Sequence, residues 1–184
     1  MQRRAILAAA LIGGAAAVPA AAHVTIHPNA LPAGGFTRVL VSVPNERDKA
    51  VTRKVEVDFP SGFVFASYEP VPGWRATIRY RNLATPVKAF GETISREIAS
   101  VTWSGGRIGN GQFQTFPLSL AFPDRPGATL TFKALQTYSN GEVVRWVGAP
   151  SADEPAPRVV ITSKTSPVRD FTGVAPQVAL HRSS

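Results

Sequence analysis

The chemistry that His23 can do depends on its position, because the segment before it has the pattern of a removable export signal. Two arginines near the start, an apolar stretch over residues 5–18 and three alanines at 20–22 predict cleavage after Ala22. His23 would then be the first residue. An N-terminal histidine offers its α-amine and the Nδ1 of its own ring, which together close one six-membered chelate around a metal ion. Such nitrogen donors suit Cu(II) ahead of other common divalent ions.

Other metal ligands and nucleophiles are scarce in this chain. It has no cysteine, and its one methionine is the initiator, which excludes disulfides, thiolate sites and soft ligands for Cu(I). His27 lies four residues beyond His23 on the same strand face, about 13 Å away, too far to share one metal ion. His181 lies in the C-terminal tail and has no predicted partner. No hydrolytic triad is assembled, and we expect no enzymatic activity.

The charge and hydropathy of the chain limit the classes of partner and the compartment to be expected. The formal net charge is +8 at pH 7, which favours contact with anionic surfaces of the cell envelope. Lys and Arg are scattered rather than clustered, so nucleic acid is not expected as a partner. After residue 22, no stretch approaches the about 20 apolar residues of a membrane-spanning helix. We therefore expect an exported protein, periplasmic or extracellular, without a transmembrane segment in its mature chain.

Alternation of apolar and polar residues dominates the rest of the chain and predicts strands with one solvated face. In one run, Val55, Val57 and Phe59 alternate with charged residues. Turns rich in Pro and Gly separate the runs, and no helix is expected. The strand candidates are 24–27, 36–43, 51–59, 63–68, 74–80, 98–103, 113–121, 129–135, 142–147 and 158–162.

Short strands at this spacing predict an all-β fold, an immunoglobulin-like antiparallel β-sandwich. We divide the chain into a cleaved signal peptide at 1–22, one sandwich domain at 23–162 and a flexible C-terminal tail at 163–184.

The pair Asn140-Gly141 is a strong hairpin signal. A two-residue loop there predicts a register in which Trp146 lies opposite Leu135. Glu142, four residues from Trp146 along the strand, is then about 13 Å from it, too far to share one metal ion. Tryptophans in sandwiches ordinarily belong to the core, and Trp74 and Trp103 are expected there.

Five stretches, taken in order, together carry a family pattern. They are His23–Ile26 followed by Pro28, Val71–Trp74, Val101–Gly106, Gly111–Pro117 and Lys133–Trp146. From His23 to about Val160 the chain resembles the YcnI-like family of exported copper-binding proteins. The resemblance implies an immunoglobulin-like sandwich that holds Cu(II) through a brace built on one histidine.

The resemblance also implies the ligands. His23 supplies its amine and its ring, and Trp146 and a glutamate assist. The glutamate has no counterpart, because Thr115 stands at the position where the family has its glutamate ligand, before Phe-Pro. A neutral hydroxyl is a poor ligand for Cu(II), so the resemblance implies weaker binding in this chain.

Three classes of function follow. The first is an exported Cu(II) carrier with a role in copper trafficking or homeostasis, whose partners are the copper ion and copper-transport or copper-chaperone proteins of the envelope. The second, a copper-dependent oxidative enzyme, needs a second well-placed histidine, which neither His27 nor His181 provides. The third is a metal-free envelope binding or adhesion module that has lost tight copper binding, which the substitution at Thr115 favours.

Overall fold

The computed structural model describes residues 23–167 of the chain. The predicted signal peptide and the tail beyond residue 167 lie outside the described residues. The regular secondary structure of the described residues consists of strands alone, which confirms the all-β prediction. The strands are β1 (Thr25–His27), β2 (Ala30–Pro32), β3 (Phe36–Asn45), β4 (Thr52–Asp58), β5 (Ala66–Tyr68), β6 (Arg75–Ala89), β7 (Glu92–Ile108), β8 (Gln112–Ala121), β9 (Thr129–Thr131), β10 (Lys133–Tyr138), β11 (Val143–Trp146) and β12 (Arg158–Thr162).

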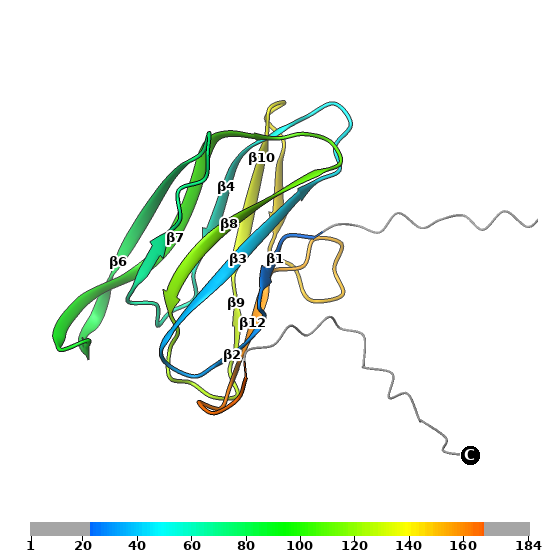
Figure 1. Cartoon of the computed structure of the whole chain (residues 1–184). Coiled ribbons are helices and arrows are strands. Elements are labelled where there is room, and N and C mark those ends of the chain that lie inside the picture. Colours follow the sequence, from blue (N-terminus) through cyan, green and yellow to red (C-terminus); the bar gives the residue numbers. More distant parts are fainter. Residues whose placement is uncertain (1–22, 168–184) are drawn as a thin grey trace, which may run out of the picture.

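Two large sheets pack face to face (Figure 1). One has the order β1-β3-β8-β5 and the other β11-β10-β4-β7-β6, while a small third sheet has the order β2-β12-β9. Among the strand pairs of the described residues, only β2 and β12 run parallel. Trp103 of β7 stacks on Phe116 of β8 across the core, with ring centroids 4.7 Å apart. The molecule is therefore a sandwich, and its two large sheets are antiparallel.

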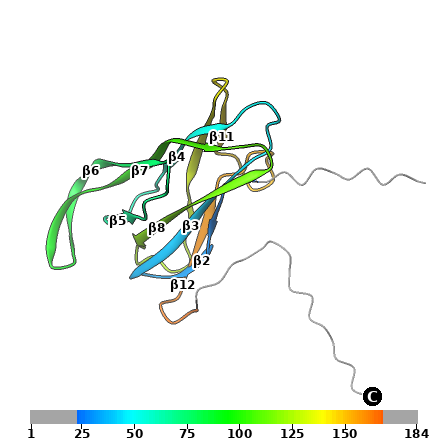
Figure 2. The ribbon, with the colours of Figure 1, turned by 45° about the horizontal axis from the view of Figure 1, so that its top comes forward.

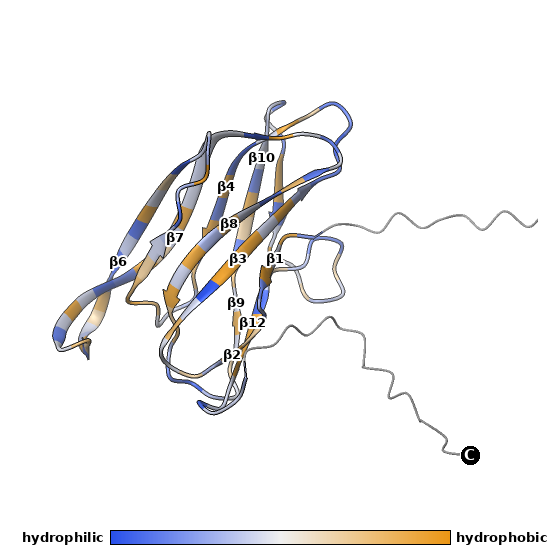
Figure 3. Cartoon of the chain, in the orientation of Figure 1, coloured by the Kyte–Doolittle hydropathy of each residue, from blue (hydrophilic) through white to orange (hydrophobic). Residues whose placement is uncertain are grey.

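The alternation along the strands explains which face of each sheet is buried. In β3, Val39, Val41 and Val43 are fully buried, whereas the residues between them are partly exposed. Apolar and polar residues accordingly alternate along the ribbon (Figure 3). The described residues contain no helix long and apolar enough to cross a membrane.

The strand predictions fell short mainly at one hairpin. β6 and β7 extend well past the predicted 74–80 and 98–103, pair as far as Ala89↔Glu92, and form a hairpin that projects from the body of the sandwich (Figure 2). Much of this extension is exposed on both faces, so it lacks the one-sided burial that produces alternation. The predicted strand 129–135 is divided between β9 and β10, because buried Phe132 bonds its N–H to Pro157 instead.

The predicted register of the β10–β11 hairpin was wrong by one residue. Trp146 pairs with Ala134, not with Leu135, because the loop has three residues and ends in Gly141 at a φ of +88°. That left-handed conformation is the one a three-residue hairpin loop requires of glycine. Since a shift of one residue exchanges the two faces of a strand, the true register turns Trp146 inward.

Candidate metal centre

His23 lies two residues before β1, at one end of the sandwich. Val24 and Ile26 beside it are only 2% and 3% exposed, and their burial fixes the path of the chain at this point. β1 pairs with β3 through Thr25↔Ser42. Two further residues in the same register bring His23 beside Pro44, near the end of β3.

The structure brings His23 and Trp146 together from distant parts of the sequence. Their ring centroids are 5.8 Å apart, with the ring planes inclined by 60°. Trp146 is 8% exposed, whereas His23 is half-buried. The indole therefore contacts the histidine while most of its ring is packed in the protein.

A buried glutamine, Gln136, holds the indole of Trp146 in place. The Nε1–H of Trp146 donates to Oε1 of Gln136 at 3.0 Å. The amide nitrogen of Gln136 donates to the carbonyl of Pro44 and to Oγ1 of Thr52, each at 2.8 Å. Gln136 is fully buried, so these bonds satisfy both of its N–H groups where water cannot. They also link the two sheets at the point where His23 lies.

Trp146 lines a hollow of about 160 Å³ that also contains carboxylates; we call it the indole hollow. Its acidic residues are Glu46, Asp153 and Glu154. His23 lines an adjacent hollow of about 430 Å³. The segment 148–155 contributes to both hollows and lies beside the start of the described chain (Figure 1).

Glu46 reaches this hollow because the turn after β3 is fixed by a second buried amide. Asn45 is 1% exposed, and its nitrogen donates to the carbonyls of Ala50 and Ile108 at 2.9 and 2.8 Å. Its oxygen accepts the backbone N–H of Arg47 at 2.7 Å. The carboxylate of Glu46 therefore starts from a rigid backbone.

Thr115 lies elsewhere. It pairs with Ser42 of β3, and Ser42 in turn pairs with Thr25 of β1, so two strand spacings, about 10 Å, separate Thr115 from β1. It lines neither the indole hollow nor the hollow of His23. The structure thus unites His23 with Trp146 but does not bring Thr115 to them.

Sequence reasoning did not single out Glu46, which lines the indole hollow. Its signal was available in the pairing of two predicted strands, because an N-terminal strand antiparallel to 36–43 brings His23 next to whatever follows that strand. Glu46 follows it within three residues. Asp153 and Glu154, which the sequence could not place, come to the same hollow through the 148–155 segment.

Glu142 is engaged away from the indole. Arg47 donates to it through Nη2 at 2.7 Å and through Nε at 3.2 Å. This hydrogen bond holds the pKa of Glu142 below its usual value and raises the pKa of Arg47. Burial raises the pKa of the neighbouring Tyr138 phenol.

The other histidines of the sequence are His27 and His181. His27 lines the same hollow as His23, and its Nε2 shares a 2.9 Å hydrogen bond with Oγ1 of Thr25. His181 lies outside the described residues. No group of three His, Cys, Asp or Glu side chains suited to a metal ion occurs between residues 23 and 167. A centre that uses the amine and ring of one histidine does not need such a group.

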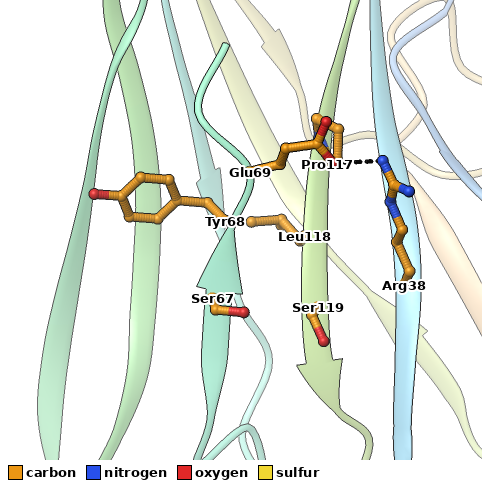
Figure 4. Close-up of a pocket in the computed structure, with 7 residues that line it drawn as sticks. All are labelled: Arg38, Ser67, Tyr68, Glu69, Pro117, Leu118 and Ser119. Atoms are coloured by element: carbon orange, nitrogen blue, oxygen red, sulfur yellow. Dashed lines mark hydrogen bonds and ion pairs between the residues drawn. The ribbon is translucent and has the colours of Figure 1, made fainter.

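A further hollow of about 330 Å³ lies between β3, β5 and β8. Arg38 and Glu69 form an ion pair beside it, and Ser67, Tyr68 and Ser119 are among its lining residues (Figure 4). Both charged side chains are more than half exposed. This hollow contains no histidine and offers no comparable set of metal ligands.

Comparison with known proteins was made on sequence and on structure. The profile of a family described as "Domain of unknown function (DUF1775)" matches residues 23–161. The chain is 33% identical over 147 residues to the copper-binding protein CutI of Bacillus subtilis (strain 168), an overlap of 79% of this chain and 65% of that protein. The chain therefore spans slightly less than two thirds of the length of this relative.

The fold has a solved counterpart. An uncharacterized protein from Nocardia farcinica, described as immunoglobulin-like, superposes with a TM-score of 0.60 at 33% identity. The match covers 77% of this chain and 99% of that protein. The immunoglobulin-like sandwich expected from the strand pattern is thereby confirmed.

Proposed function

The chain belongs to the DUF1775 family, the YcnI-like family of the sequence analysis, and on this premise we propose that it is an exported protein that binds Cu(II) at His23. Its role is copper trafficking or homeostasis. The observation that carries the proposal is the contact of His23 with Trp146, whose ring centroids are 5.8 Å apart. A relative named for copper binding supports copper as the metal.

The donor set fits Cu(II). After cleavage at Ala22, the α-amine and Nδ1 of His23 would supply two nitrogens in one chelate, and the indole of Trp146 would cover one side of the ion. Cu(II) still requires an anionic oxygen to offset its charge. We assign that role to Glu46, which shares the indole hollow and follows Pro44 on a rigid turn.

Carboxylates are available beside the indole. Glu46, Asp153 and Glu154 line the indole hollow together with Arg47, whose guanidinium is paired with Glu142. With Glu46 as the oxygen ligand, the neutral Thr115 would no longer favour a metal-free module.

We propose a carrier rather than an enzyme. Copper oxidation chemistry of the kind considered above needs a second histidine at the metal. In the described part of the chain the other histidine is His27, which shares a hydrogen bond with Thr25 and lies four strand residues, about 13 Å, from His23. A site of one histidine can hold and hand over Cu(II) without turnover, and envelope copper-transport or chaperone proteins are the partners that this role requires.

The test is a calorimetric Cu(II) titration of two proteins, one that begins at His23 and one that carries an extra N-terminal alanine. The α-amine is a ligand only when it belongs to His23, so the extension should remove tight binding while leaving the fold intact. Mass spectrometry of the exported protein establishes whether cleavage occurs after Ala22. Equal affinities of the two proteins would falsify the proposed brace.

A further inference from the structure

Three phenylalanines from distant segments form one exposed cluster, the phenylalanine patch. Phe36 at the start of β3, Phe65 before β5 and Phe90 at the β6–β7 turn are 54%, 40% and 59% exposed. The ring centroid of Phe36 lies 5.2 Å from that of Phe65 and 5.0 Å from that of Phe90. Contiguous exposed apolar surface of this kind marks an interaction site in a water-soluble domain.

Phe90 occupies a position that the backbone does not favour for it. The pairing Ala89↔Glu92 leaves Phe90 and Gly91 as a two-residue loop, and Phe90 has a φ of +53°. Asn, Asp and Gly suit this left-handed conformation, whereas a bulky residue is strained in it. A bulky side chain in a strained conformation that is also 59% exposed contributes little to the stability of the fold, which indicates a role in binding.

The hairpin that ends at Phe90 also carries cations. Its arginines nearest the sandwich are already paired, Arg79 with Glu56 and Asp58 and Arg81 with Glu97, which leaves Lys88 and Arg96. Neither Lys88 nor Arg96 forms an ion pair with another described residue, and the guanidinium of Arg96 lies 4.4 Å from the ring centroid of Tyr80. Tyr80 and Val87 add exposed apolar surface to this hairpin.

We propose that the tip of the β6–β7 hairpin and the phenylalanine patch dock on an anionic lipid surface. The aromatic rings would enter the interface between head groups and acyl chains, while Lys88 and Arg96 contact lipid phosphates. Charge favours an anionic lipid surface over a second copy of the chain, because two copies would bring two cationic hairpins together. The hairpin projects from the sandwich (Figure 2), with hydrophobic segments near its turn (Figure 3), so it can reach a flat surface ahead of the remaining strands.

The test is co-sedimentation of the protein beginning at His23 with vesicles. Vesicles of phosphatidylcholine alone are compared with vesicles that also contain phosphatidylglycerol. We expect binding to the anionic vesicles that weakens as salt rises, because the cationic contribution is screened. Phe90→Asn should reduce it by about tenfold, the loss expected for one buried phenylalanine.

The choice of variants keeps folding and binding apart. Asn suits the left-handed φ of residue 90, so Phe90→Asn should melt no lower than the wild type. Phe113→Asn is the matched control, because Phe113 is 69% exposed at the opposite end of β8, and it should bind as the wild type does. Lys88→Gln with Arg96→Gln should lower binding to anionic vesicles alone.

Two outcomes would overturn the proposal. The first is equal vesicle binding by the wild type and Phe90→Asn. The second is a concentration-dependent dimer in sedimentation velocity that Phe90→Asn abolishes, without vesicle binding by the wild type, which would assign the patch to self-association. Neither outcome bears on copper binding, since His23 is not part of the patch.

Discussion

The indole N–H of Trp146 donates a 3.0 Å hydrogen bond to the side-chain oxygen of Gln136. The same amide holds the carbonyl of Pro44, two residues before Glu46. One fully buried side chain thus fixes the position of the indole relative to the proposed carboxylate ligand. Groups behind the direct ligands of a metal commonly determine its affinity through such bonds.

Gln136→Met should therefore weaken Cu(II) binding by about tenfold, the scale typical of a lost supporting hydrogen bond. Methionine fills similar volume but cannot bond to the indole or to Pro44. In the nitrogen-resolved proton spectrum, exchange of the Trp146 indole proton with solvent should accelerate even without copper. Calorimetry and this exchange rate are the two measurements.

Thr52→Val is the control for Gln136→Met. It removes the 2.8 Å bond between Thr52 and Gln136 but leaves the indole bond in place. Both variants should lower the melting temperature, yet only Gln136→Met should alter copper affinity and indole exchange. An equal loss of affinity in both would mean that Gln136 matters only for stability.

The sequence pointed to two members of the proposed centre but not to the third, for a physical reason. His23 was evident from the cleavage pattern, and Trp146 from the family resemblance. Glu46 becomes apparent only when β1 is paired with β3, because its proximity comes from strand pairing and not from spacing along the chain. Thr115 was named from the family resemblance as the residue in the place of the glutamate, and a local match to Phe-Pro carries no information about the sheet position of β8.

The carboxylates of the indole hollow can be ranked by substitution. Glu46→Gln should weaken Cu(II) binding by about tenfold or more, because an amide supplies no charge to the ion. Asp153→Asn and Glu154→Gln should each weaken it less, since these residues act through the field of the hollow. Thr115→Glu should leave the affinity within about threefold of the wild type, because about 10 Å separates this residue from β1.

Calorimetry at constant pH measures all four variants. A tenfold gain from Thr115→Glu, together with no effect of Glu46→Gln, would restore the assignment made from the sequence. Thermal melts supply the control, since Glu46, Asp153 and Glu154 lie at the surface of the hollow and their amides should not disturb the core.

The alternation of apolar and polar residues predicted the strands correctly wherever one face of a strand is buried. β3 and β4 were predicted to within two residues at each end, because Val39, Val41 and Val57 face the core. The outer half of the β6–β7 hairpin was missed because both of its faces meet solvent. Its length depends on cross-strand pairing and on the turn at Phe90, and neither leaves a period in the sequence.

Copper affinity should fall with pH, because protons compete for both nitrogens of the chelate. Binding should therefore weaken continuously below about pH 8 and be largely lost by about pH 5. Titrations with a competing Cu(II) chelator at several pH values measure this. Constant affinity across that range would indicate that carboxylates hold the metal without His23.

Trp146 should report copper directly through its fluorescence. Cu(II) is paramagnetic and redox-active, so it quenches an indole at short range, and the ring of Trp146 lies 5.8 Å from that of His23. The other two tryptophans pack against Phe116, buried Trp103 at 4.7 Å and partly buried Trp74 at 5.0 Å between ring centroids. Trp146→Phe should therefore abolish most of the copper-dependent quenching, while Trp74→Phe and Trp103→Phe should each retain it. Emission titrations of the three variants, each starting at His23, make the comparison; quenching that persists in Trp146→Phe would place the bound copper away from the indole hollow.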